Sequence, residues 1–245
     1  MATGDDTLSC IWKDPSEAWS LSNSVTLGIM GDEWREMTHA NASTTALLLI
    51  GFQNDYFVPT GILHGVVEES HRVSGTLQNT IRLIDSFKDS EMTMVNTPIV
   101  FSGLYDELEN PIGILKTIRD VQAFKEGTPG AETISEISIY GDRIIELPGK
   151  KSFNAFSNTT LHATLRNKGV TRIVFAGCVT SICVHASALQ AFDLGYEVTM
   201  LSDCTSDCTS ARTPIEQEFF CSDVFPLFSH VMTLDEFLVQ EHAVS

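Results

Sequence analysis

The sequence lacks an excess of positive charge. It has 15 Lys and Arg against 32 Asp and Glu, a formal net charge of −17 over 245 residues. Nucleic acids and anionic membrane surfaces repel such a chain. It also lacks a secretory signal and any apolar run long enough to cross a membrane. We therefore expect a cytoplasmic protein that binds a small molecule, with no nucleic acid or membrane as partner.

A disulfide framework and a metal-binding motif are missing as well. The six cysteines have no regular spacing, which favours reduced thiols. Cys204 and Cys208 form a CxxxC pair without flanking histidines or a second pair, so they do not complete a zinc site. His64 and His71 are seven positions apart and read as a loop residue and a helix-surface residue. We expect no metal and no cofactor.

Repeats and low-complexity segments are also absent. The length suits one large α/β domain, which we place at residues 44–245. Residues 1–43 have no clear period and are longer than an ordinary loop. We expect them to form an N-terminal arm that packs on the domain or on a second subunit.

Apolar runs alternating with segments of helical spacing fill the rest of the chain. The runs predict strands at residues 45–50, 92–95, 143–147, 173–176, 198–201 and 231–233, and helices are expected at 72–89, 131–137, 159–167, 214–220 and 234–239 as well as after Gly177. This alternation predicts an α/β fold with a parallel sheet. Residues 96–129, interrupted by Gly and Pro, are typical of a lid or binding loop.

Three positions follow the ends of different predicted strands. Gly51 ends the first strand, Lys150 follows the third and Cys183 follows the fourth. The carboxyl ends of parallel strands share one edge, where open α/β sheets bind ligands. A helix N-terminus and a nearby lysine would both favour a nucleophilic thiolate at Cys183. The alternatives are a buried structural cysteine and a solvated loop lysine.

Several motifs resemble one known family. They are Leu47–Phe57, Lys150–Thr159, Ala176–Val184 and Ala191–Val198. In this order and spacing they resemble the isochorismatase-like cysteine hydrolases, and in particular the amidohydrolase branch that includes N-carbamoylsarcosine amidohydrolases and biuret hydrolases. The resemblance runs from about residue 45 to about residue 240.

The resemblance implies a Rossmann-like, three-layer fold with a six-stranded, mainly parallel sheet, usually in a homodimer or homotetramer. It also implies an Asp-Lys-Cys triad, in which Cys183 matches the nucleophile and Lys150 matches the lysine, with the adjacent Lys151 as the alternative match. The family has a non-proline cis peptide bond, which here falls between Cys178 and Val179. The backbone N–H groups of Val179 and Cys183 would then point at the developing oxyanion.

One position departs from the family pattern. Gly51 stands where the family has its catalytic aspartate, directly before Phe52-Gln-Asn-Asp. That carboxylate would move a proton from the thiol to the leaving amine, which is typically worth on the order of 100- to 10,000-fold in rate. We therefore expect poor turnover. An engineered substitution, a natural loss of activity or replacement by Asp55 could each account for Gly51.

The combined hypothesis is a metal-free cysteine hydrolase that cleaves a C–N bond of a small amide, ureido or carbamoyl compound through a thioester. The stretch Val95–Phe101 has none of the histidines of the nicotinamidase metal site. The alternatives are a non-catalytic binding or regulatory protein and a vinyl-ether hydrolase of the isochorismatase type. We predict the catalytic positions Cys183, Lys150 and Gly51, and the substrate-binding residues Val179, Thr180, Tyr56, Phe57, Phe156 and Asn96.

Overall fold

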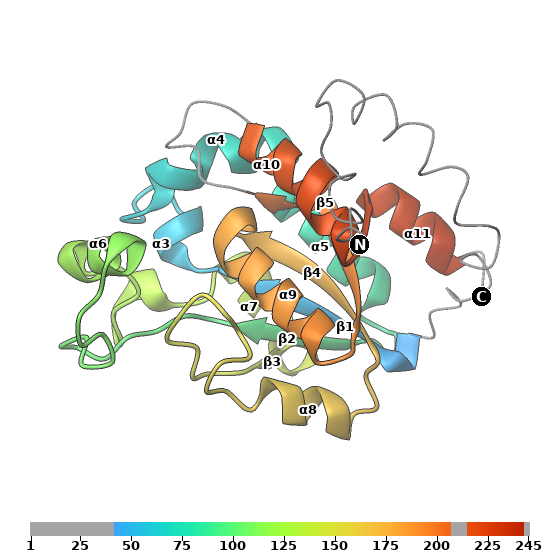
Figure 1. The fold of residues 1–245 in the computed structure, drawn as a ribbon, viewed down its shortest axis with the longest axis horizontal. Coiled ribbons are helices and arrows are strands. Elements are labelled where there is room, and N and C mark those ends of the chain that lie inside the picture. The colour runs from blue at the N-terminus through green and yellow to red at the C-terminus, as the bar shows by residue number, and fades with distance from the viewer. Residues whose placement is uncertain (1–41, 207–214, 243–245) are drawn as a thin grey trace, which may run out of the picture. The chain divides into compact units, whose positions relative to one another are not determined.

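A six-stranded sheet with every strand parallel forms the centre of the protein (Figure 1). The computed structural model describes residues 42–206 and 215–242. The strands are β1 (Thr45–Ile50), β2 (Thr93–Thr97), β3 (Ile145–Glu146), β4 (Arg172–Cys178), β5 (Glu197–Ser206) and β6 (His230–Met232), in the spatial order β3-β2-β1-β4-β5-β6. The predicted α/β fold with a parallel sheet is confirmed.

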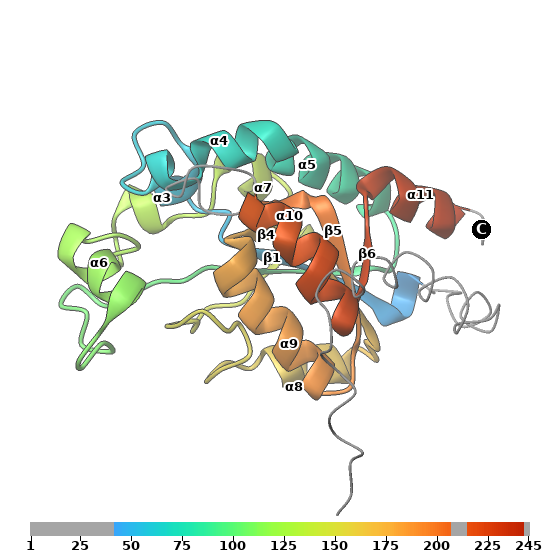
Figure 2. The same cartoon turned by 45° about the horizontal axis from the view of Figure 1, so that its top comes forward.

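The two central strands, β1 and β4, are fully buried because helices cover both faces of the sheet. Leu47 and Leu49 of β1 pack with Leu83 and Phe87 on one face, and Leu48 packs on the other. This explains why the sequence shows continuous apolar runs rather than alternation. Figure 2 shows the resulting layers, with α5 and α11 on one side of the sheet and α8 and α9 on the other.

The helices have the following bounds: α3 Asn54–Phe57, α4 His64–Ser74, α5 Thr76–Phe87, α6 Gly113–Val121, α7 Ser135–Ser138, α8 Leu161–Asn167, α9 His185–Asp193, α10 Ile215–Phe219 and α11 Leu234–His242. Short 3-10 or π turns complete the path: η1 Ala42–Thr44, η2 Pro129–Ala131, η3 Gly141–Arg143, η4 Thr180–Val184, η6 Phe220–Val224 and η7 Phe225–Leu227. Within the described ranges, no helix has both the length and the apolar character needed to cross a membrane.

Helices α3, α4 and α6 differ from the sequence-based expectation, and no helix was expected at Asn54–Phe57. A helix was expected to begin only at residue 72, but α4 runs from His64 to Ser74 and is followed by Gly75, whose φ of +67° suits only glycine well. Helix α6 lies inside residues 96–129, which were expected to be irregular. The predicted arm at residues 1–43 lies almost entirely outside the described residues, so it stays a prediction.

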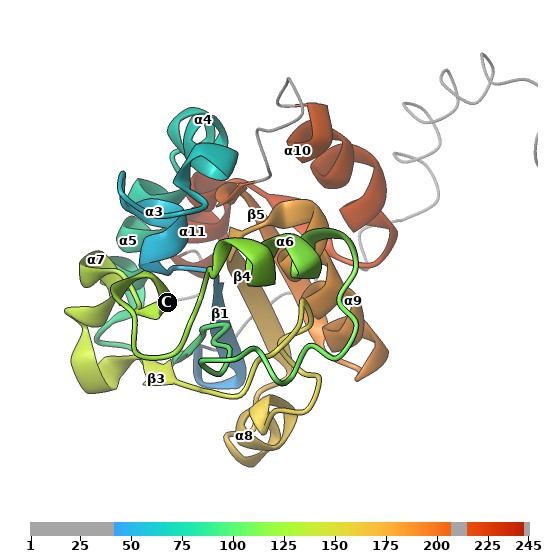
Figure 3. The same cartoon turned by 90° about the vertical axis from the view of Figure 1, so that its left-hand side faces the viewer.

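The carboxyl ends of the strands meet beneath α6. Figure 3 views this side of the molecule, with α6 in front of the ends of β1 and β4. A separate apolar cluster fills the space there and includes Tyr56, Ile99, Ile118, Phe124 and Val179. The expected ligand-binding edge of the sheet is therefore covered by the 96–129 segment.

Candidate active site

Cys183 lies in the π turn η4, between the end of β4 and the start of α9. The peptide bond between Cys178 and Val179 is cis, as the resemblance implied. The carbonyl oxygen of Val179 accepts hydrogen bonds from the N–H groups of Ile182 and Val184, both at 3.1 Å, which closes the turn. The Cys183 side chain is held at the first turn of a helix and is nearly buried, with 6% of its surface exposed.

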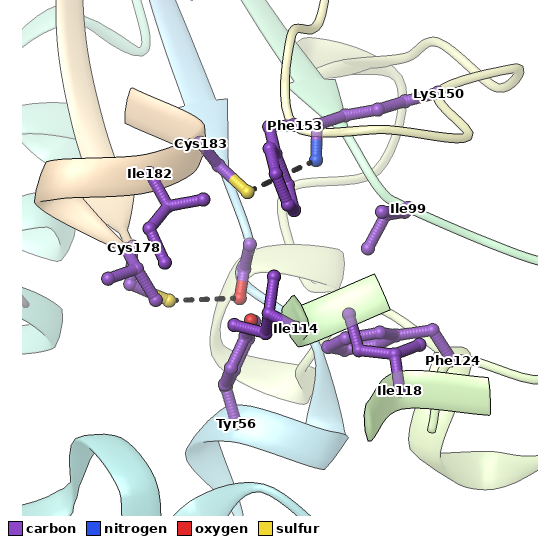
Figure 4. Close-up of a pocket in the computed structure, with 12 residues that line it drawn as sticks. Tyr56, Ile99, Ile114, Ile118, Phe124, Lys150, Phe153, Cys178, Ile182 and Cys183 are labelled. Carbon is purple, nitrogen blue, oxygen red and sulfur yellow. Dashed lines mark hydrogen bonds between the residues drawn. The ribbon is translucent and has the colours of Figure 1, made fainter. Parts of the chain in front are cut away.

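Lys150 lies in the loop after β3, and its side chain extends towards Cys183 (Figure 4). Its Nζ donates to Cys183 Sγ at 3.7 Å, and only 1% of the residue is exposed. The following loop is fastened to α9, because the N–H of Ala155 donates to Ser187 Oγ at 3.0 Å and Ser187 Oγ donates to the Cys183 carbonyl at 2.7 Å. Ser187 therefore links the lysine loop to the cysteine turn.

Lys151 points elsewhere. Its Nζ lies 2.7 Å from Glu107 and donates to the Val100 carbonyl. Of these two adjacent lysines, the structure brings Lys150 to the cysteine.

Gly51 faces the same space and has a backbone conformation suited to glycine. Its φ is +76°, and a Cβ built on it would lie 2.5 Å from the carbonyl oxygen of Cys178 and 3.0 Å from Cys178 Sγ. Cys178 Sγ donates to the Gly51 carbonyl at 3.6 Å. A side chain at position 51 therefore requires the backbone to shift.

The residues after Gly51 hold the covering segment in place. The Gln53 side chain donates to the carbonyls of Ile99 and Ala131 at 2.9 and 2.7 Å and accepts from the Ile99 N–H at 2.9 Å. The Asp55 carboxylate accepts from the Phe124 N–H at 2.6 Å and the Ile62 N–H at 3.5 Å. Asp55 is thus engaged by the backbone and does not line the cavity at Cys183.

A narrow cavity lies between these elements and has a volume of about 10 Å³. That volume is comparable to the space one water molecule needs. Its polar side chains are Lys150, Cys183, Cys178 and Tyr56. The other lining residues are Gly51, Ile99, Ile114, Ile118, Phe124, Phe153, Val179 and Ile182.

The chain matches a known protein family over most of its length. The isochorismatase domain matches residues 45–236. The chain belongs to the isochorismatase family. A ureidoacrylate amidohydrolase from Variovorax paradoxus is 28% identical over 211 residues, covering 81% of each chain. A protein from Arabidopsis thaliana named "probable inactive nicotinamidase" is 27% identical over 185 residues, covering 74% of this chain and 85% of its own.

Solved structures of isochorismatase-like hydrolases agree with the fold. A cysteine hydrolase from Pseudomonas syringae pv. phaseolicola has a TM-score of 0.70 at 18% identity, covering 84% of this chain and 96% of its own. The N-carbamoylsarcosine amidase of Thermoplasma acidophilum has a TM-score of 0.61 at 20% identity, covering 78% and 97%. At these identities the likeness concerns the fold.

The structure of this isochorismatase-family chain brings some of the predicted site residues together and separates others. Cys183, Lys150, Gly51, Val179 and Tyr56 all line the cavity. The other predicted substrate-binding residues, Thr180, Phe57, Phe156 and Asn96, do not.

These four residues have other surroundings. Phe57 stacks between Phe52 and His71, with ring centroids 5.0 and 4.1 Å away. Phe156 packs in the core beside Tyr196. The Asn96 amide donates to Thr133 Oγ1 at 2.9 Å. Thr180 is fully buried.

The residues missed by sequence reasoning come from the covering segment, from the end of β4 and from the loops beside the predicted catalytic positions. They are Ile99, Ile114, Ile118, Phe124, Phe153, Cys178 and Ile182. The apolar spacing of Ile114 and Ile118, four apart, was a signal for a helix facing the site. In the part of the chain that the structure describes, no group of three or more His, Cys, Asp or Glu side chains is arranged to hold a metal ion. The absence of a cofactor stays a prediction.

Proposed function

We propose that the protein is a cysteine-dependent hydrolase that cleaves a C–N bond of a small amide, ureido or carbamoyl compound through a thioester. The observation that carries the proposal is the contact of 3.7 Å between Lys150 Nζ and Cys183 Sγ beside a cavity. A buried ammonium group is costly unless it is paired, and the thiolate form of Cys183 supplies the pairing charge. The same pairing activates the sulfur as a nucleophile.

The reaction would proceed in two steps at Cys183. The thiolate attacks the carbonyl carbon, and the backbone N–H groups of Val179 and Cys183 stabilise the oxyanion. When the tetrahedral intermediate collapses, the C–N bond breaks and the nitrogen takes a proton from water, leaving as ammonia or an amine. Water then hydrolyses the thioester, which releases the acid and restores the thiol.

Gly51 limits the first step. The leaving nitrogen must be protonated, and position 51 has no carboxylate to deliver the proton. The Asp55 carboxylate is bonded to the Phe124 backbone rather than facing the cavity. We infer that acylation of Cys183 by amides is slow in this chain.

Two substitutions at position 51 test this account, Gly51→Asp and Gly51→Asn. Both introduce the same steric strain at φ +76°, but only the aspartate adds an acid-base group. Over a panel of small amides, ureas and carbamoyl compounds, we expect Gly51→Asp to release ammonia at least about 100-fold faster than Gly51→Asn. Equal rates in the two variants, on every compound, would contradict the assigned role of position 51.

One alternative is supported by the geometry of Gly51. A Cβ at position 51 would lie 2.5 Å from the Cys178 carbonyl oxygen, so the backbone conformation there favours glycine. This favours glycine as the native residue, in a protein that binds a ligand without turnover. That reading predicts ligand binding but no ammonia release from either variant at position 51. A vinyl-ether hydrolase would instead keep its activity in Cys183→Ala.

A further inference from the structure

The wall of the cavity is apolar on the sides away from Cys183. Helix α6 contributes Ile114 and Ile118, Phe124 lies beside Ile118, and Phe153 lies close to Lys150 and Cys183 (Figure 4). Ile118 and Phe124 are 2% and 0% exposed, so these side chains are packed rather than solvated. The cavity has room for about one water molecule, so a substrate group beyond the scissile carbon would have to move these side chains apart and would then contact hydrocarbon.

The charged group in this wall is Lys150, and it is already placed against the thiol. Its Nζ donates to Cys183 Sγ, and Tyr56 and Cys178 are the remaining polar side chains of the lining. A substrate carboxylate entering here would lose its hydration and would compete with Cys183 for the ammonium group. Burying an ion without its own partner is strongly unfavourable.

We propose that the site selects uncharged substrates with a compact apolar acyl group, that is, neutral primary amides rather than ureido or carbamoyl acids. This inference rests on the proposed function, because it takes Cys183 as the attacking group. Ile114 and Ile118 of α6 are the residues that set the selectivity, since they form the wall that faces the acyl substituent.

Alkylation of Cys183 tests the proposal without any turnover. Iodoacetamide and iodoacetate differ mainly in charge. The ratio of their alkylation rates with glutathione gives the preference of a free thiol for the neutral reagent. Peptide mass spectrometry follows Cys183, with Cys221 as the internal reference outside the cavity. We expect Cys183 to favour iodoacetamide at least about 10-fold more than glutathione does. The ammonium group of Lys150 alone would favour the anionic iodoacetate. The proposal is overturned if the ratio of the iodoacetamide rate to the iodoacetate rate is no higher at Cys183 than in glutathione.

Substitutions on α6 test which residues cause the preference. Ile118→Arg and Ile114→Arg each put a cation into the wall, and the half-buried position 114 serves if the variant at 118 does not fold. We expect either variant to shift the ratio at least about 10-fold towards iodoacetate. Ile112→Arg makes the same charge change at a position that is 84% exposed, directly before the helix, and should leave the ratio within about 2-fold. An unchanged ratio in folded Ile114→Arg would contradict the assignment.

Protection by ligands gives a second readout. Isovaleramide and malonamate have nearly the same shape, but only malonamate carries a carboxylate. Isovaleramide should slow the reaction of Cys183 with iodoacetamide at concentrations at least about 10-fold lower than malonamate. If Cys183 reacts faster than Cys221 but shows no preference for neutral reagents, the selectivity fails and the proposed function stands. If Cys183 reacts no faster than Cys221 with either reagent, both fail.

Discussion

At the scale of single residues, Lys150 and Lys151 make a matched pair with different surroundings. Lys150 is 1% exposed and contacts Cys183, whereas the Lys151 side chain is 40% exposed and pairs with Glu107. We expect Lys150→Met to slow alkylation of Cys183 by iodoacetamide at least about 10-fold, because the ammonium group stabilises the thiolate. Lys151→Met should change the rate by less than about 2-fold. Equal effects of the two substitutions would mean that Lys150 does not activate the thiol.

His71 predicts a pH dependence of stability. Burial lowers the pKa of His71 to about 4 from its usual 6.5, and the charge of nearby His64 acts in the same direction. The folded state therefore binds fewer protons than the unfolded state between these two values. Stability is fully present above about pH 6.5 and decreases as the pH falls to about 4, by about 3 kcal/mol at the end of that window.

Urea unfolding at pH 7 and pH 4.5 measures this contribution. In His71→Gln the loss of stability between the two pH values should be smaller by about 2 to 3 kcal/mol. His230→Gln is the control, because the His230 side chain is 40% exposed, and it should keep the full loss. A His71→Gln protein with the same loss as the parent would contradict the buried neutral histidine.

The adjacent aromatics Tyr56 and Phe57 show what sequence reasoning could not resolve at this scale. Both follow the Phe-Gln-Asn-Asp motif, and both were predicted to bind substrate. Neighbouring residues on a helix point about 100° apart, so only one of them reaches the cavity. The motif predicted which element lies at the site, whereas the packing of α3 decides which side chain faces it.

At the scale of elements, Arg143 fastens the end of α5 to the start of β2. Its guanidinium donates to the carbonyls of Phe87, Ser90 and Met92 at 2.9, 3.2 and 2.8 Å, and also to that of Lys88. These carbonyls lie at the last turn of α5 and in the turn that follows, and the Phe87 carbonyl also accepts from the Ser90 N–H at 3.0 Å. The arginine thus satisfies a helix end that has no glycine cap.

We expect Arg143→Ala to lower the free energy of unfolding by about 2 to 3 kcal/mol, because several backbone acceptors lose a charged donor together. Urea titration with far-UV circular dichroism measures the change. Arg119→Ala is the control on α6, where the exposed Arg119 pairs with Asp120, and it should cost less than about 1 kcal/mol. A similar small cost for both variants would show that water replaces Arg143 at this helix end.

The strands were easier to predict from the sequence than the helices that cover the site. Six apolar runs indicated the six strands, because strands buried on both faces must be apolar throughout. Helix α6 was missed because it has only nine residues, begins with Gly113 and lies between Pro111 and Gly127. Its start follows Ile112, and it stops at Gln122, which adopts φ +61°, a left-handed conformation that is unusual for a non-glycine residue.

At the scale of the whole molecule, a buried ion pair joins the central sheet to the last helix. Arg172 at the start of β4 contacts Glu241 of α11 at 2.7 Å, and their side chains are 5% and 6% exposed. Arg82 and Asp235 form a pair of the same length, also involving α11, but their side chains are 54% and 77% exposed. The two pairs differ mainly in burial.

Burial should determine how much each ion pair contributes to the free energy of unfolding. Glu241→Gln leaves the buried Arg172 charge with only the longer contact to Glu197, at 3.7 Å, and is expected to cost about 2 to 3 kcal/mol of unfolding free energy. Asp235→Asn should cost less than about 1 kcal/mol, because water and salt screen the exposed pair. Thermal or urea unfolding of the two variants compares them directly, and equal costs would contradict the role of burial.

The assembly of the whole molecule stays a prediction from the family resemblance, which implies a homodimer or homotetramer. Sedimentation equilibrium measures the mass against the 26.9 kDa of one chain. The cavity, by contrast, is formed by described residues of a single chain.

The most direct test of the account is ammonia release from a panel of neutral amides by this chain and by Cys183→Ala. The account predicts slow release by the parent and a loss of release of about 1,000-fold or more in Cys183→Ala. Because acylation is the slow step, no acyl adduct should accumulate on Cys183. Undiminished release by Cys183→Ala would contradict the account. So would the absence of release from every amide while Cys183 reacts no faster than Cys221 with iodoacetamide.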